Sequence, residues 1–157
     1  FEKARLAHMG VDLGLRGGRY IVGRKRLKMD ELRGATRDVH HDDVIATAPV
    51  IPKDPGARPG ELGTTCDIPF GSCVPAKVGR LLVASGKSVD TEGGNWRIFR
   101  GMPGCMVYGQ ATGAAAAVAA RLGVPAQELP VQELQRELLR QRVRLGDSRR
   151  LAELGLA

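Results

Sequence analysis

The chain has 157 residues and carries 24 Lys and Arg against 17 Asp and Glu, which gives a net charge of +7. A hydrophobic content of 43% is typical of one folded domain and excludes a disordered chain. The 21 glycines lack the period of collagen, and three widely spaced cysteines exclude a disulfide scaffold.

The start of the chain carries no secretory signal, because charges interrupt the first apolar residues after Phe1. We expect a processed chain or a piece of a longer one, located in the cytoplasm. The positive charge gathers toward both ends, with its tightest cluster at Arg24, Lys25 and Arg26. No recognition helix or set of stacking aromatics accompanies it, so we expect a solvated basic face and no nucleic-acid partner. An anionic ligand or partner is the alternative.

The first third of the chain predicts short elements. Residues 20–22 are strand formers closed by Gly23, and residues 30–32 predict a helical turn that Gly34 stops. Residues 44–50 predict a second strand, ended by Pro52. Residues 52–63 are rich in Pro and Gly and predict a loop.

The middle of the chain predicts a strand, a loop and a long helix. Two prolines make residues 66–75 an extended segment at a sheet edge or in a loop. Residues 78–84 are an apolar run between glycines and predict a buried central strand. A glycine-rich loop follows, and then a helix from Pro103 to Leu122 with Gly123 at its C-terminal cap.

This helix has no charge between residues 101 and 120, which raises the alternative of a membrane span. Alanine and glycine supply most of it, so its hydropathy favours a helix outside the membrane. Gly109 and Gly113 share one face, and that face is suited to tight packing on a sheet or a flat ligand.

The C-terminal part predicts two helices. Pro130 marks a helix start, and apolar residues then recur at helical spacing at Val131, Leu134, Leu138 and Val143. Residues 146–157 predict a second short helix or a frayed end.

Two sets of residues raise chemical alternatives. The string from His40 to Asp43 resembles a metal site, but it lacks a spaced partner, so a polar loop is favoured and no metal is expected. Cys105 falls in the first turn of the long helix, where the dipole stabilises a thiolate. A small residue packing beside a ligand is the favoured alternative.

The strongest signal combines the strand at 78–84, the glycine loop and the uncharged start of the long helix. Such a helix start presents unpaired N–H groups and a partial positive charge, which suit a phosphate, a carboxylate or an electron-rich ring edge. Lys87 and Arg100 bring further positive charge. The pattern predicts an anionic or cofactor ligand without identifying it.

Several strings, in this order, resemble one known family. They are RYIVG at 19–23, CDIPFGSCVP at 66–75, LLVASGK at 81–87 and RGMPGCMVYGQATG at 100–113. They resemble "RRIVG", "IPYRSLVP", "NLLVAGR" and "RVMPTCMATGQAAGTAAALA" of a family of FAD-dependent oxidoreductases. The similarity covers residues 16–143, and the GQATGAAAA block is its most specific part.

The resemblance implies an α/β fold, namely the C-terminal portion of a FAD/NAD(P)-binding, Rossmann-like fold of the glutathione-reductase type. The N-terminal βαβ unit with its GxGxxG pyrophosphate site is absent from the sequence, because Gly14, Gly17 and Gly18 have the wrong spacing. Residues 1–65 then form a strand and loop segment from the substrate side. Residues 66–123 form the last strand, loop and helix of the FAD-binding domain, and residues 124–157 form an amphipathic helical region.

The implied function is a C-terminal fragment or split subunit of a FAD-dependent oxidoreductase that acts on a small molecule and is not active alone. Its partner is the missing N-terminal FAD-binding half or a separate flavoprotein subunit. The alternative is a non-catalytic assembly module that docks on such a subunit. No catalytic residue is assigned. The implied FAD-binding residues are Gly86, Lys87, Arg100, Met102, Pro103, Gly104, Cys105, Gly109 and Gln110.

The sequence also departs from the family. Gly71 replaces the arginine of "IPYR", and Lys87 replaces the arginine of "AGR". A lysine is a point charge and does not bind an anion through two parallel hydrogen bonds as arginine does.

Overall fold

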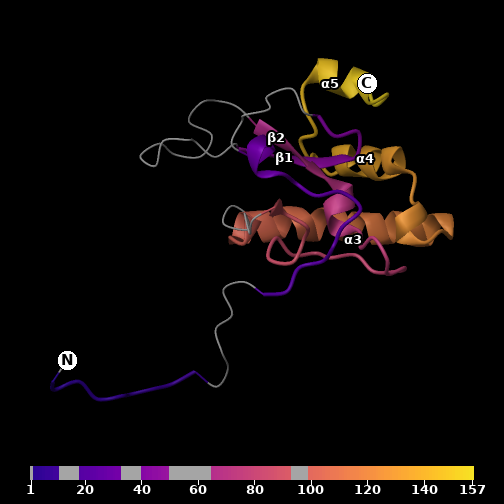
Figure 1. Cartoon of the computed structure of the whole chain (residues 1–157). Helices are drawn as coiled ribbons and strands as arrows, with labels where there is room; N and C mark the ends of the chain where they lie inside the picture. Colours follow the sequence, from indigo (N-terminus) through magenta and orange to yellow (C-terminus); the bar gives the residue numbers. More distant parts are fainter. Residues whose placement is uncertain (1, 11–17, 33–39, 50–64, 93–98) are drawn as a thin grey trace.

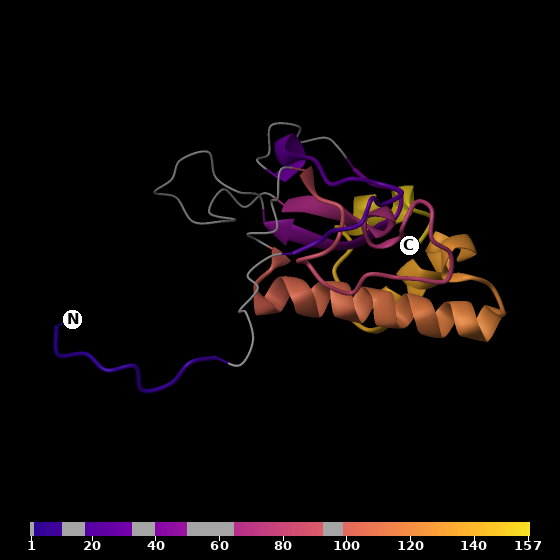
Figure 2. The same cartoon turned by 60° about the horizontal axis from the view of Figure 1, so that its bottom comes forward.

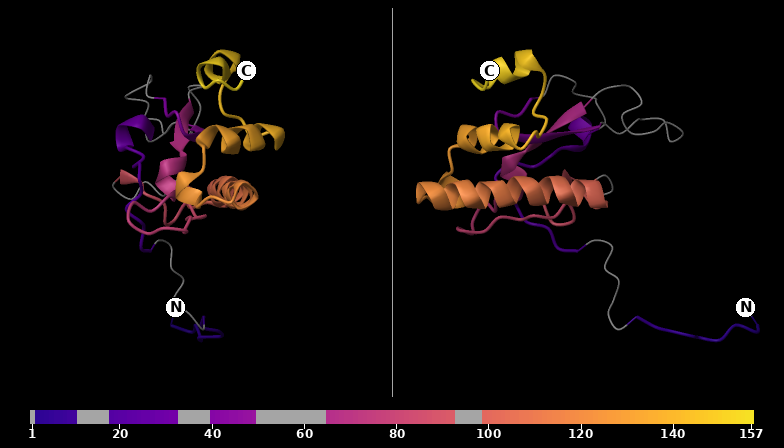
Figure 3. Two further views of the ribbon diagram at one scale, coloured as in Figure 1. Left: turned by 90° about the vertical axis from the view of Figure 1, so that its right-hand side faces the viewer. Right: turned by 180° about the vertical axis from the view of Figure 1, so that it is seen from behind.

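The computed structural model describes residues 2–10, 18–32, 40–49, 65–92 and 99–157 (Figure 1). The elements run in the order α1 (Met29–Leu32), β1 (Val44–Pro49), β2 (Thr65–Pro69), the 3-10 turn η1 (Phe70–Cys73), α3 (Met102–Leu122), η3 (Ala126–Glu128), α4 (Val131–Arg140) and α5 (Ser148–Glu153). Helices and a sheet occur together, as in the predicted α/β class. Residues 2–10 run away from the body of the fold in every view (Figures 1 to 3).

The long helix α3 is the main support of the fold. Its first turn contains Pro103, and Gly123 ends it in the left-handed conformation with φ of 70°. Val124 N–H then donates to Ala119 O over 3.0 Å, which closes the C-terminal cap. The predicted helix is thereby confirmed to within one residue.

The sheet is one antiparallel pair, β1 with β2, whose two faces differ. Ala46, Ala48, Cys66 and Ile68 are buried in the core that α3 and α4 cover. Thr47 lies opposite Asp67 on the other face, since residues directly paired across two strands share a face. Figure 3 shows α3 and α5 on opposite sides of this pair.

The two C-terminal helices agree with their prediction. Leu134 and Leu138 of α4 are buried, while Arg136 and Arg140 pair with carboxylates one turn earlier. Asp147 caps α5, because its Oδ1 accepts the N–H of Arg150 over 2.8 Å.

The prediction of a buried central strand at residues 78–84 is wrong. These residues form a turn and an irregular segment, in which Val78 is 54% and Leu81 is 45% exposed. Arg80 has a φ of 57°, which interrupts the extended conformation. The side chain of Gln127, on η3, bonds backbone groups that a neighbouring strand would otherwise take, namely Arg80 N–H, Val78 O and Leu81 O.

The other short predictions have mixed outcomes. Residues 20–22 are not a regular strand, although Ile21 N–H bonds Ser88 O and Val22 O accepts Ala76 N–H. The helical turn at 30–32 and the strand that begins at Val44 are confirmed. The extended segment at 66–75 becomes β2 followed by η1. The predicted stops at Gly34 and Pro52 and the predicted loop at 52–63 lie outside the described residues.

Candidate functional site at the start of α3

The first turn of α3 is open at its N-terminus. Gly101 precedes it in an extended conformation and supplies no side-chain cap, and the turn contains no acidic residue. Met102, the first residue of the helix, is 81% exposed. Among the described residues no side chain caps this helix start, so the positive end of its dipole suits a negatively charged or electron-rich group.

Gly86 and Gly104 allow the backbone of Phe99, just before α3, to pack closely against the glycine loop and the first turn of the helix. A Cβ atom on Gly86 would lie 2.0 Å from the carbonyl oxygen of Phe99, and one on Gly104 would lie 2.4 Å from the same oxygen. The Phe99 ring is buried and packs edge-on against Tyr108, with 5.6 Å between ring centroids. Gly86 and Gly104 are therefore needed for this packing, whatever ligand the site holds.

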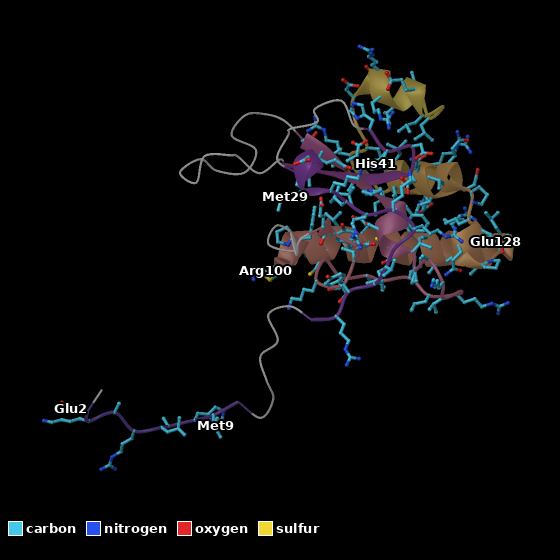
Figure 4. The ribbon with its side chains drawn as sticks, in the orientation of Figure 1. Glu2, Met9, Met29, His41, Arg100 and Glu128 are labelled. Atoms are coloured by element: carbon cyan, nitrogen blue, oxygen red, sulfur yellow. The ribbon has the colours of Figure 1, made fainter. Side chains whose placement is uncertain are left out.

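The two cationic residues predicted to bind a ligand, Lys87 and Arg100, are sequence neighbours of the residues that make this contact. Lys87 comes directly after Gly86 and is exposed, and Arg100 comes directly after Phe99 and is half-buried. The Phe99 contact thus places the backbone of both cationic residues near the α3 start. Figure 4 shows Arg100 at this end of α3 and Glu128 at the other.

Cys105 packs within the same turn. Its Sγ lies 3.6 Å from Phe99 O and 3.6 Å from Arg100 O, and the residue is half-buried. Both carbonyl oxygens can accept a weak hydrogen bond from the thiol S–H. The geometry favours the packing role of Cys105 over a free thiolate.

The remaining predicted residues lie further along α3 and do not join this group. Gly109 and Gly113 line a groove of about 400 Å³ between α3 and the segment that holds Leu82 and Ala84. Figure 2 shows that segment running alongside α3. A Cβ on either glycine would meet no atom within 4 Å. The expected close approach is therefore not made within the described residues. Gln110 points elsewhere and donates to Gln141 Oε1 over 3.1 Å.

Two of the three residues of the basic cluster at 24–26, Lys25 and Arg26, pair with internal carboxylates. Lys25 Nζ lies 2.7 Å from Asp43 Oδ1, and Arg26 Nε lies 2.8 Å from Oδ1 of the buried Asp90. The Lys25 ammonium also holds the pKa of Asp42 below its ordinary value. These pairs give the cluster a structural role.

Gly71 is part of the same arrangement. Its N–H donates to Asp43 Oδ2 over 2.7 Å, and a Cβ there would lie 2.9 Å from the Lys25 side chain. The stem of Lys25 thus passes over the position where the family has an arginine.

The histidine string forms polar contacts of the kind expected for a loop. His41 Nε2 lies 2.7 Å from Glu31 Oε2, and His40 Nδ1 lies 3.4 Å from Asp67 Oδ2. Within the described ranges, no group of three or more metal-binding side chains could hold an ion. None of the helices in those ranges combines the length and hydropathy that a membrane crossing needs.

Sequence reasoning missed Phe99 and Gln127. Phe99 acts through its backbone carbonyl, which no residue pattern reveals, and Gln127 bonds backbone groups of residues that are far from it in the chain. Its position in a Pro-Ala-Gln-Glu turn carries no signal of that role.

The fold is mixed α/β, and the start of α3 has no side-chain cap among the described residues. The family model described as FAD dependent oxidoreductase matches residues 1–138. The chain therefore belongs to the FAD-dependent oxidoreductase family. No curated protein and no solved structure matches it.

Proposed function

We propose that this chain supplies one side of a flavin site in a FAD-dependent oxidoreductase. The observation that carries the proposal is the start of α3, which has no side-chain cap, no acid in its first turn and two cationic residues beside it. Backbone N–H groups and a positive dipole end are the chemistry that an electron-rich ring edge or an anionic ligand takes. The residues present therefore fit FAD, which supplies hydride transfer when it is bound.

Each residue would have a distinct role. The N–H groups of the first turn at Met102 and Gly104 would stabilise negative charge at the ring edge, since the Cys105 N–H already donates to Gly101 O. Lys87 and Arg100 would hold anionic parts of the cofactor near Gly86. Met102 and Pro103 would cover the ring and exclude water. The sequence has no GxGxxG at a strand–helix junction, so the pyrophosphate site would come from a complementary segment.

The groove beside Gly109 would receive that segment. Gly109 and Gly113 form its floor on α3, and the neighbouring segment at Leu82 has few backbone partners. In a complete fold of the glutathione-reductase type, residues 66–123 would be the C-terminal portion of the FAD-binding domain. The complementary segment would then pack on α3.

Titration of the purified chain with FAD tests whether the complementary segment is needed for flavin binding. We expect weak binding or none, because the pyrophosphate site is absent. A yellow protein with stoichiometric flavin and a dissociation constant below about 1 μM would contradict the proposal.

The variant Gly109→Leu tests the groove in the reconstituted enzyme. The added side chain starts in open space in this chain, so the variant should keep the fold. It should abolish FAD retention by filling the groove. Arg136→Leu on the exposed side of α4 is the control, and it should retain flavin. Full flavin content in Gly109→Leu would show that the groove is not used.

A further inference from the structure

A second cleft lies on the far side of the sheet, away from α3. It has a volume of about 480 Å³ and is formed by the outer face of β1 and β2 on one side and by α5 on the other. Thr47, Thr65 and Asp67 line it from the strands, and Arg149, Arg150 and Glu153 line it from α5 and its start. Figure 4 shows His41, the neighbour of the lining residue His40, at the level of the strands.

The floor of this cleft is a buried ion pair. The side chains of Asp67 and Arg150 are 7% and 14% exposed, and Arg150 Nη2 lies 3.6 Å from Asp67 Oδ2. Arg150 Nη2 also donates to His41 O over 2.8 Å. The Nε atom of Arg150 is buried without a hydrogen-bond partner in the described part of the chain. A charged or polar group that is buried without a partner costs free energy, so the unpartnered Arg150 Nε calls for an explanation.

The charged side chains of the cleft, apart from Asp147, are already paired with one another. Glu153 pairs with Arg149 at 3.3 Å and with Arg150 at 3.4 Å. Asp147 accepts the backbone N–H of Arg150. A charged ligand would have to break one of these pairs, whereas an uncharged one would not.

The cleft nevertheless keeps hydrogen-bonding groups for a ligand. Among the described residues, the hydroxyls of Thr47 and Thr65 make no hydrogen bond, and the ring of His40 is half exposed. Carboxylate oxygens at the rim accept hydrogen bonds, and the guanidinium of Arg149 donates them. A ligand that both donates and accepts at several points would satisfy this set.

We infer that this cleft binds an uncharged polyhydroxylated molecule of about monosaccharide size, at a site separate from the α3 start. Alternating hydroxyl groups donate to the carboxylates and accept from Arg149 without displacing any ion pair. The volume lies within the range of small-molecule sites. The inference does not depend on flavin binding.

Ligand-observed NMR with the whole chain tests it, with D-glucose, D-galactose and D-mannose as probes. At least one of them should bind with a dissociation constant of about 10 mM or lower. D-glucuronate and D-glucosamine, the charged analogues, should bind more weakly than the neutral sugar. Absence of binding by all three neutral sugars would overturn the inference, and so would about tenfold tighter binding of either charged analogue.

Two variants locate the site. Arg149→Gln and Thr65→Val each remove a polar group at an exposed position, so both should fold. Each should weaken sugar binding by about threefold to tenfold, the effect of one lost hydrogen bond. Arg136→Gln is the matched control, since Arg136 is also an exposed helical arginine with a carboxylate partner, and it lies outside the cleft. Unchanged affinity in both cleft variants would place binding elsewhere and overturn the inference.

Discussion

Replacing glycine by alanine should have opposite effects on stability at three positions near α3. Gly86→Ala and Gly104→Ala would each drive a Cβ into the Phe99 carbonyl, so we expect a loss of about 2–3 kcal/mol in the free energy of unfolding. Gly109→Ala meets open space inside a helix and should gain up to about 1 kcal/mol. Chemical denaturation followed by circular dichroism measures all three. Equal effects at the three positions would refute the Phe99 contact.

At the scale of elements, the ion pair between Glu137 and Arg140 on α4 predicts a dependence on pH. Arg140 and Gln141 lower the pKa of Glu137 to about 2 from its ordinary 4.5. A carboxyl whose pKa is lower in the folded state stabilises the fold fully above its ordinary pKa. That contribution is lost as the pH falls from about 4.5 toward 2.

The melting temperature of Glu137→Gln checks this. It should lie below that of the wild type at pH 7, and the two should converge near pH 2. Glu128→Gln is the comparison, because Glu128 has no ion pair among the described residues. A constant difference at both pH values would exclude the Arg140 pair as the cause.

The helices could be predicted from the sequence because their signals are local. Pro103 and Gly123 mark the two ends of α3, and the spacing of Leu134 and Leu138 gives the buried face of α4. The segment at 78–84 could not, because a strand depends on a partner in space. There, Arg80 turns the chain and Gln127 occupies the backbone groups.

The whole molecule leaves large apolar side chains in solvent. On α3, Met102 and Met106 are exposed. The irregular segments add the exposed side chains of Tyr20, Val22 and Val78. Apolar side chains that gather in one exposed patch are usually covered by a partner. We therefore expect the isolated chain to bind a hydrophobic dye and to self-associate. A monomer in analytical ultracentrifugation with a sharp thermal transition and no dye binding would contradict this.

At the scale of the whole molecule, one of the two candidate sites could be proposed from the sequence and the other could not. The candidate site at the α3 start could be proposed from the sequence, because Gly86, Arg100 and Gly104 lie close together in the chain, in strings that resemble one family. The cleft beneath α5 could not be predicted, because it brings His40, Asp67 and the strand threonines beside residues 146–153, which are distant in the chain. Asp67 and Arg150 are brought together only by the packing of α5 over the strands.

The three free thiols also give the molecule a built-in position for a chemical reporter. Burial raises the pKa of Cys66 and of Cys73 to about 12, so both stay protonated and shielded at neutral pH. Cys105 is only half-buried, and it lies in the first turn of α3. Maleimide fluorophores should therefore label the native chain at Cys105 first, as peptide mass spectrometry would show. The emission of that dye would then report directly when a cofactor or a second polypeptide arrives at this helix end.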